Sequence, residues 1–208
     1  MVNTSHPVIK KANKADLSCL LTAEQVVKGR LYSFQTVTSS ELSQHIRDEI
    51  WRIFESNMQV LYHKSSFGWD PPSKRSELFH KLSRFLLIWS IPSGESTSQQ
   101  LTLQGYSMFR FEREDRQNMI YCYELQIASQ ARRMGLGAAL VHNLECIGRA
   151  LVMEKLMLTI FRANTDAKQF YILNRFAIDD TSPDSSQGKE GGEEGQSICD
   201  YEMLSKLL

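Results

Sequence analysis

A glycine-containing segment, Arg132-Arg133-Met134-Gly135-Leu136-Gly137, carries the clearest chemical signal in the sequence. It lies between an expected strand and an expected amphipathic helix, where unpaired backbone N–H groups face outward and can bind an anion. Glycines let the backbone approach phosphate oxygens closely, and the two arginines add charge-assisted hydrogen bonds. The segment therefore predicts a pyrophosphate site. An ordinary strand-to-helix turn with a surface arginine pair also accounts for this spacing.

The usual nucleotide-binding motifs are missing from the sequence. It contains neither the Gly-Lys-Ser/Thr that a P-loop requires nor a G-x-G-x-x-G opening a parallel βαβ unit. This argues against the kinase, ATPase and dinucleotide-binding classes more firmly than it argues for any other phosphate ligand.

The preceding expected strand carries a carboxylate in the string Tyr121-Cys122-Tyr123-Glu124. Such a carboxylate can accept a proton from an amine nucleophile. An α-amine with a pKa of about 7.8 is roughly a tenth unprotonated at pH 7, against about a few in ten thousand for a lysine, so one carboxylate suffices as its base. Taken alone, Glu124 is equally a structural ion-pair partner of Arg110 or Arg132.

Pleating divides this strand into two faces. A regular strand places Cys122, Glu124 and Gln126 on one face and Tyr121 and Tyr123 on the other, unless a bulge mixes them. In an acyl-transfer enzyme, backbone N–H groups of this strand would polarise the carbonyl of the acyl group. The two tyrosines are also ordinary core or rim aromatics.

Length and composition favour one intracellular domain. The chain has 208 residues, 42% of them hydrophobic, and 24 basic residues balance 24 acidic ones, so no global field marks a nucleic-acid or membrane binder. The cysteines lie far apart without metal-ligand spacing, at Cys19, Cys122, Cys146 and Cys199. No apolar run approaches the roughly 20 residues of a membrane span, and no signal-peptide pattern is present. Reduced thiols are expected.

Hydrophobic periodicity predicts an α+β fold with an antiparallel core and at least one crossover helix. The expected helices are a short one within 17–28 closing at Gly29, then 42–61, 73–82, 136–151 and 165–175. The expected strands are 30–37, 85–89, 101–111, 119–127, 155–161 and 197–204. Thr38 and Glu41 form a capping box before the long helix, 94–100 is a loop, and 112–118 connects a hairpin.

Two flexible segments are expected, one before the folded domain of residues 16–208 and one inserted within it. Residues 1–15 form a disordered basic tail with Lys10, Lys11 and Lys14, which serves nuclear import or has no role. Residues 181–196 form a flexible insertion in a glycine-rich acidic tract. It is either a solubilising loop or an attractor for a basic tail.

Two motifs resemble cofactor segments of the GNAT superfamily of N-acetyltransferases. Arg132-x-x-Gly135-x-Gly137 resembles its acetyl-CoA pyrophosphate loop, and N-x-x-A-x-x-F-Y at Asn164 to Tyr171 resembles its second cofactor segment. The resemblance implies a single GNAT-like domain, with a central, mostly antiparallel mixed sheet flanked by helices, that uses acetyl-CoA as co-substrate and no metal. The cofactor-binding residues are then Leu125, Gln126, Ile127, Arg132, Arg133, Met134, Gly135, Leu136, Gly137, Ala138, Asn164, Ala167 and Phe170.

Within the superfamily, residues 56–205 resemble the histone N-terminal acetyltransferases of the NatD type. The matching strings include Asn57-Met58-Gln59, Gly68-Trp69 and Tyr121-Cys122-Tyr123-Glu124. This resemblance implies transfer of acetyl to the α-amine of histones four and two-A, whose tails begin Ser-Gly-Arg-Gly. It also implies histone tails as partners, no direct contact with nucleic acid or membrane, activity as a monomer without an auxiliary subunit, and a location in nucleus and cytoplasm.

The same resemblance implies residue roles. Glu124 takes the proton of the amine directly or through water, and the position of Tyr171 suits protonation of the leaving thiolate, although Tyr171 also fits plain packing. The substrate-binding residues are Tyr62, Phe67, Trp69, Glu112, Glu114, Tyr121, Tyr123 and Tyr201. Glu112 and Glu114 hold the basic tail or are simply solvated hairpin charges.

Two departures from the NatD pattern keep other functions open. Glu112 stands where that type has Asp, and Phe67 where it often has Trp, so an indole N–H contact cannot be assumed. The alternatives are a lysine or small-amine acetyltransferase, and a catalytically silent module that binds acetyl-CoA or histones.

Overall fold

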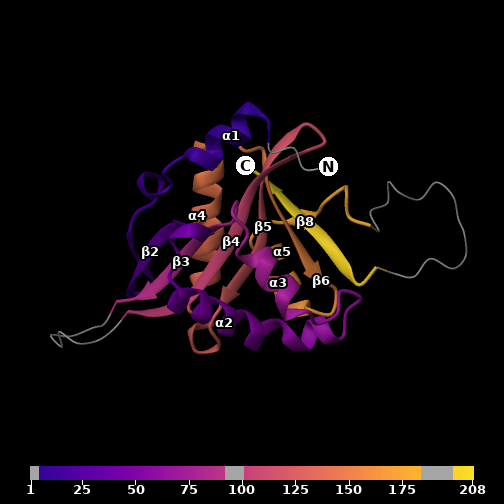
Figure 1. Cartoon of the computed structure of the whole chain (residues 1–208), viewed down its shortest axis with the longest axis horizontal. Coiled ribbons are helices and arrows are strands. Elements are labelled where there is room, and N and C mark those ends of the chain that lie inside the picture. Colours follow the sequence, from indigo (N-terminus) through magenta and orange to yellow (C-terminus); the bar gives the residue numbers. More distant parts are fainter. Residues whose placement is uncertain (1–4, 92–100, 184–198) are drawn as a thin grey trace, which may run out of the picture.

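The alternating apolar runs of the sequence assemble into an eight-stranded sheet in the order β1-β2-β3-β4-β5-β6-β8-β7 (Figure 1). The computed structural model describes residues 5–91, 101–183 and 199–208. The strands are β1 Glu24–Val27, β2 Arg30–Thr38, β3 Arg84–Ser90, β4 Thr102–Glu114, β5 Gln117–Ile127, β6 Lys155–Phe161, β7 Ala177–Ile178 and β8 Tyr201–Leu207. The helices are α1 Pro7–Lys14, α2 Gln44–His63, α3 Pro71–Leu78, α4 Leu136–Ala150 and α5 Thr165–Leu173.

Every neighbouring pair in the sheet is antiparallel except β5 and β6. The parallel pair is joined by α4, as a parallel connection requires a crossover. The expected α+β fold, with its mostly antiparallel mixed sheet and crossover helix, is therefore confirmed.

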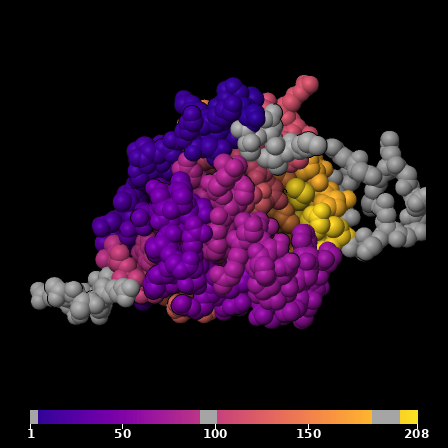
Figure 2. Space-filling view, viewed as in Figure 1, coloured from indigo at the N-terminus to yellow at the C-terminus, as the bar shows by residue number. Residues whose placement is uncertain are grey.

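Helices cover both faces of the sheet. On one face α1, α4 and α5 pack on the strands through side chains such as Ile9, Leu140 and Tyr171. On the other face α2 and α3 contribute Phe54 and Leu78 to a second apolar cluster. Figure 2 shows the residues of α2 and α3 gathered on the face toward the viewer. In the described part of the chain, none of the helices has the length and apolarity to cross a membrane.

The N-terminal segment is ordered, contrary to the expected disordered tail of residues 1–15. Helix α1 buries Ile9 and Ala12 almost completely, with 0% and 1% of their surface exposed. Residues three apart lie on one face of a helix, so these two side chains form a short apolar stripe against the sheet. Two turns of helix are too short for this stripe to stand out in the sequence. Residues 1–4 lie outside the described ranges.

The expected helix within 17–28 is also wrong. A 3-10 turn at Ser18–Leu20 leads into β1, and β1 pairs with β2 as a hairpin. Its turn residues Lys28 and Gly29 have φ of 47° and 78°. Positive φ at both central residues is typical of a two-residue hairpin turn, which favours glycine. Gly29 therefore closes a hairpin and not a helix.

The capping box exists but caps a different element. Thr38 and Glu41 bracket the 3-10 turn Ser39–Glu41, and Leu42 is extended, with φ −70° and ψ 122°. Helix α2 starts only after this break, and the side chain of Ser43 accepts its capping hydrogen bond from the N–H of Ile46.

Helix α3 and the β4–β5 hairpin are shifted relative to the sequence prediction. Asp70 caps α3, and the two prolines that follow it occupy the first helical positions, where no N–H is needed. The hairpin strands continue through Glu112 and Glu114 to a turn at Asp115 and Arg116, so the expected seven-residue connection shrinks to two residues.

The C-terminal elements also differ from expectation. Strand β8 starts at Tyr201, not at 197, and the short β7 was not expected. The first residues of the expected flexible insertion 181–196 pack against the fold. Ser182 is 4% exposed, and its hydroxyl accepts a hydrogen bond from the N–H of Met203. The remainder of the insertion and the expected loop 94–100 lie outside the described residues.

Candidate active site

A β-bulge interrupts β5 at Tyr123. Met108 of β4 lies opposite Glu124, whereas the next residue, Phe109, lies opposite Cys122. Tyr123 therefore has no opposite residue, which is the defining feature of a bulge. One extra residue reverses the alternation of side chains along the rest of the strand.

The bulge places four polar or aromatic side chains on the same face of β5. Tyr121 and Tyr123 pack ring to ring with centroids 4.8 Å apart, and Glu124 and Gln126 face α3 and α2. Cys122 instead belongs to the cluster beneath α4. The regular-strand expectation that Cys122, Glu124 and Gln126 share a face is wrong, and the mixing by a bulge is what occurs.

A cavity of about 490 Å³ opens where β5 and β6 separate. These strands pair in parallel from Met119 to Cys122 and then diverge. Helices α2 and α3 and the loop between them form the opposite wall. The predicted site residues that line the cavity are Tyr62, Phe67, Trp69, Tyr121, Tyr123, Glu124, Leu125, Gln126, Asn164, Ala167, Tyr171 and Tyr201.

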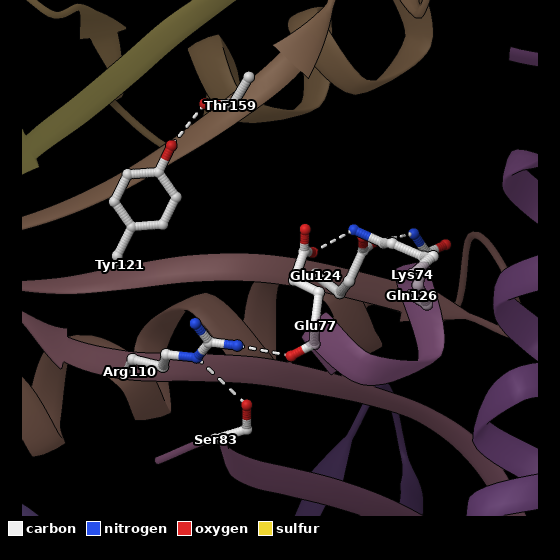
Figure 3. A network of polar contacts seen from close by, with 8 residues as sticks. All are labelled: Lys74, Glu77, Ser83, Arg110, Tyr121, Glu124, Gln126 and Thr159. Carbon is white, nitrogen blue, oxygen red and sulfur yellow. Dashed lines mark hydrogen bonds and ion pairs between the residues drawn. The ribbon is translucent and has the colours of Figure 1, made fainter. Parts of the chain in front are cut away.

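The carboxylate of Glu124 is 5% exposed and is held at both oxygens (Figure 3). Lys74 Nζ lies 2.8 Å from Oε1, and Gln126 Nε2 donates to Oε2 over 2.7 Å. Each carboxylate oxygen has two lone pairs, so acceptor capacity remains toward the cavity. Glu124 is thus a desolvated, oriented carboxylate.

The ion pairs of Glu124 with Arg110 or Arg132 are not formed. Arg110 donates to the backbone oxygen of Glu77 over 2.5 Å and to Ser83 Oγ over 3.2 Å (Figure 3). Arg132 donates to Asn57 Oδ1 over 2.5 Å. The cation paired with Glu124 is Lys74.

Lys74 was missed by the sequence analysis. Its ammonium group lies 5.3 Å and 5.4 Å from the ring centroids of Phe54 and Tyr62 and 2.5 Å from Glu77 Oε1. Burial acts to lower the pKa of Lys74, but Glu124, Tyr62 and Glu77 raise it above its ordinary value. No motif marks this lysine, because its partner lies on a strand far along the chain.

Polar contacts also fix the tyrosines of β5. The hydroxyl groups of Tyr121 and Thr159 are 2.5 Å apart (Figure 3), and Tyr123 donates to Glu112 Oε1 over 2.7 Å. Burial raises the pKa of Tyr121 to about 12 and that of the Glu112 carboxyl above its usual value. Both tyrosines are therefore fixed at the cavity wall.

The two acidic substrate residues do not line this cavity. Glu112 is 6% exposed and lies behind Tyr123. Glu114 lines a separate cavity of about 280 Å³, together with Asp115 and Asp179. Asp179 forms a buried ion pair with Lys155 at 3.0 Å.

Aromatic rings form the rim of the main cavity. Phe67 is 55% exposed, and its ring lies 5.6 Å from those of Phe161 and Tyr201. Trp69 stacks on Phe54 at 6.0 Å, on the wall formed by α2. These rings present apolar faces to any chain that enters the cavity.

The glycine loop fits a phosphate-bearing ligand. Gly135 has φ of 84° and caps α4 without a side-chain hydrogen bond, so the first-turn N–H groups are left for an external acceptor. A Cβ added at Gly135 would lie 3.1 Å from Val27 Cγ1, and one at Gly137 3.1 Å from Phe170 Cζ. The positive φ favours glycine at position 135, and a side chain at either position would require its neighbour to move by a few tenths of an ångström.

The remaining cofactor candidates contribute in different ways. Leu136 is 1% exposed and Met134 packs against the same core, so their side chains point inward and only their backbone can bind a ligand. Arg132, Arg133, Ala138 and Ile127 are not among the residues lining the main cavity, and Phe170 packs on Gly137.

Helix α5 closes the cavity. The side chain of Asn164 accepts a hydrogen bond from the N–H of Ala167 over 3.2 Å and caps the helix. Tyr171 is 7% exposed, and burial raises the pKa of its hydroxyl well above the ordinary value. Its hydroxyl therefore remains protonated at neutral pH. Within residues 5–91, 101–183 and 199–208, no group of three His, Cys, Asp or Glu side chains is placed to hold a metal.

Comparison with known proteins extends these observations. Residues 46–174 match the acetyltransferase (GNAT) family. An acetyltransferase from Streptococcus agalactiae superposes with a TM-score of 0.58 at 11% identity, over 84% of this chain and 98% of that one. A GNAT acetyltransferase from Elizabethkingia anophelis with acetyl-CoA bound gives 0.52 at 12% identity, over 85% and 98%. The PaiA N-acetyltransferase of Thermoplasma acidophilum in complex with coenzyme A gives 0.53 at 14%, over 85% and 99%.

Proposed function

Because this acetyl-CoA-dependent enzyme belongs to the acetyltransferase (GNAT) family, we propose that it acetylates the N-terminal α-amine of a protein, as histone N-terminal acetyltransferases of the NatD type do. The observation that carries the proposal is the carboxylate of Glu124, which lines the cavity where β5 and β6 diverge and is held at both oxygens.

One base is enough for an α-amine. Roughly a tenth of α-amines are already neutral at pH 7, and the α-ammonium group, with a pKa of about 7.8, gives up its proton readily to a carboxylate base. A lysine side chain, whose pKa is about 10.4, loses its proton far less readily. Glu124 lies on β5, where this strand stops pairing with β6, and a single base at that point favours the α-amine over the ε-amine.

Acetyl-CoA supplies the thioester whose acetyl group is transferred. Glu124 accepts one proton of the α-ammonium group directly or through one water, and the neutral amine then forms a bond to the acetyl carbon. The nitrogen loses a second proton as the amide forms, and this proton replaces the one that Tyr171 gives to the thiolate. Backbone N–H groups of β5 beyond Cys122, where the strand no longer pairs with β6, are available to polarise the carbonyl. Tyr171 donates a proton to the thiolate as the carbon–sulfur bond breaks, since its hydroxyl is protonated at neutral pH.

The surroundings of Glu124 suit a small, basic N-terminal tail. Phe67 and Tyr201 flank the cavity mouth, and the walls leave room for residues with small side chains. Glu114 lies farther along β4, at the separate smaller cavity, and would attract a basic side chain downstream of the amine, whereas the buried Glu112 supports Tyr123 from behind. We therefore propose histones four and two-A, with tails beginning Ser-Gly-Arg-Gly, as substrates of a monomeric enzyme in nucleus and cytoplasm.

A peptide assay tests this function. Ser-Gly-Arg-Gly-Lys with a free α-amine should be acetylated in the presence of acetyl-CoA, and the same peptide with a blocked α-amine should not. Mass spectrometry of the product locates the acetyl group. Transfer that survives blocking identifies a lysine acetyltransferase, and binding of acetyl-CoA without turnover of any amine identifies a silent binding module.

A further inference from the structure

A base buried as deeply as Glu124 needs compensation for its charge. Transfer of a carboxylate out of water favours the neutral, protonated form, and a protonated carboxyl cannot accept the proton of an amine. Glu124 is 5% exposed, so little water contacts its carboxylate. An ordered positive charge beside it is the direct remedy.

The titratable groups that interact with Glu124 come from five elements. Lys74 is on α3, where it also contacts Glu77, and the neutral groups on α2, β4, β5 and α5 are Tyr62, Tyr106, Cys122 and Tyr171. Burial raises the pKa of Tyr62 and of Cys122 to about 12, and those of the other two tyrosines well above the ordinary value. At neutral pH the compensating charge in this set is therefore that of Lys74.

We propose that Lys74 is a positioning residue that holds Glu124 as an ionised, oriented carboxylate on the cavity wall. This inference rests on the proposed role of Glu124 as the base. The ammonium group touches Oε1 at 2.8 Å, while Gln126 fixes Oε2 at 2.7 Å, so that the carboxylate plane has a single orientation.

Lys74 is anchored by contacts other than Glu124. Its ammonium group lies between the rings of Phe54 and Tyr62 and contacts Glu77, which is on the same helix. Its side chain is 10% exposed. The charge therefore stays in place while Glu124 exchanges its proton, which distinguishes it from a mobile surface lysine.

The test compares Lys74→Met, Lys74→Arg and Arg75→Met. Met preserves the apolar stem without the charge, and Arg restores the charge. Arg75 is a matched control, because it is a cation on the same helix that lies 4.0 Å from the ring of Trp51. Circular dichroism and acetyl-CoA affinity establish that each variant is folded, and Lys74→Gln replaces Lys74→Met if the latter does not fold.

We expect Lys74→Met to move the acidic limb of the kcat/KM profile to higher pH by about one to three pH units, because an adjacent opposite charge stabilises a carboxylate by that amount. At a pH below both limbs its deficit should reach about 10- to 1,000-fold, and the deficit should shrink as the pH approaches 9. Lys74→Arg should recover most of the activity, and Arg75→Met should follow the wild type. A deficit that is equal at every pH overturns the positioning role.

Infrared titration supplies a readout that needs no turnover. The carbonyl band of a protonated carboxyl, assigned by difference from Glu124→Gln, should grow in at higher pH in Lys74→Met than in the wild type. Identical titrations overturn the proposal. If the wild type transfers acetyl to no α-amine, the proposed function fails, and the infrared comparison still decides what Lys74 does to Glu124.

Discussion

Replacing Glu124 by Gln removes the proposed base and keeps nearly the same shape. The amide oxygen can still accept a hydrogen bond from Lys74, but the amide nitrogen then faces the donor Nε2 of Gln126, so the Gln126 amide must turn over to accept from it. The side chain keeps its size, so the cavity should retain its form. What disappears is the ability to accept a proton. We expect kcat to fall while the affinity for acetyl-CoA stays within about twofold, because the glycine loop is built on α4 and not on this side chain.

The expected losses in rate and in folding stability can both be estimated. Loss of a general base typically costs about 10² to 10⁴ in rate, or about 2.7 to 5.5 kcal/mol in the barrier. Folding stability should fall by about 1 to 3 kcal/mol, since Lys74 loses one charged partner in a buried setting. The fall is limited because Glu77 remains 2.5 Å from the same ammonium group.

Steady-state rates with a free-amine peptide, calorimetric titration with acetyl-CoA and urea unfolding measure the three quantities separately. Glu77→Gln is the matched control, because it removes the other carboxylate of Lys74 and leaves Glu124 intact. At pH 9 the deficit of Glu124→Gln should shrink, since more than about nine tenths of α-amines are then already neutral.

A folded Glu124→Gln protein with wild-type kcat at pH 7 would refute the base assignment. So would a deficit of the same size at pH 7 and pH 9, because a lost proton acceptor matters less when the amine arrives neutral. In either case the ion pair with Lys74 would be purely structural.

Three further substitutions test other parts of the structure. Gly135→Val should weaken acetyl-CoA binding by about tenfold or more in calorimetry, since φ is 84° and Val27 lies 3.1 Å from the new Cβ; unchanged affinity would contradict the loop assignment. Burial alone would raise the pKa of Asp179, but hydrogen bonds, including one from Lys155, lower it below its ordinary value. The ionised Asp179 therefore stabilises the fold fully above about pH 4, and this contribution is lost on further acidification. The difference in free energy of unfolding between wild type and Asp179→Asn, measured in denaturant titrations, should narrow as the pH falls from about 5 to about 2. A constant difference would refute this. Ile9→Ala should lower the free energy of unfolding by about 2 to 4 kcal/mol, because the side chain is 0% exposed. An unchanged free energy of unfolding would support the original expectation that this segment is disordered.

The sequence determined the features that depend on neighbours along the chain. The hairpin of β4 and β5, the helix that follows the glycine loop and the crossover to β6 were predicted because hydrophobic period and glycine placement act locally. The string that ends at Glu124 and the glycine segment around Gly135 were also visible in the sequence, and the structure places Glu124 on the cavity wall. Short elements failed for the converse reason, since the two turns of α1 carry too few residues to establish a period.

Only the tertiary structure decided how the site is assembled. The bulge at Tyr123 arises in the pairing of β5 with β4, and without it Glu124 would face α4 and not the cavity. Lys74 reaches Glu124 because α3 packs over the open end of the strands, a contact between segments far apart in sequence. A pattern of residue types fixes which face of an element is apolar, whereas register and long-range packing fix which charges meet. The carboxylate was therefore visible in the sequence, and the cation that keeps it ionised was not.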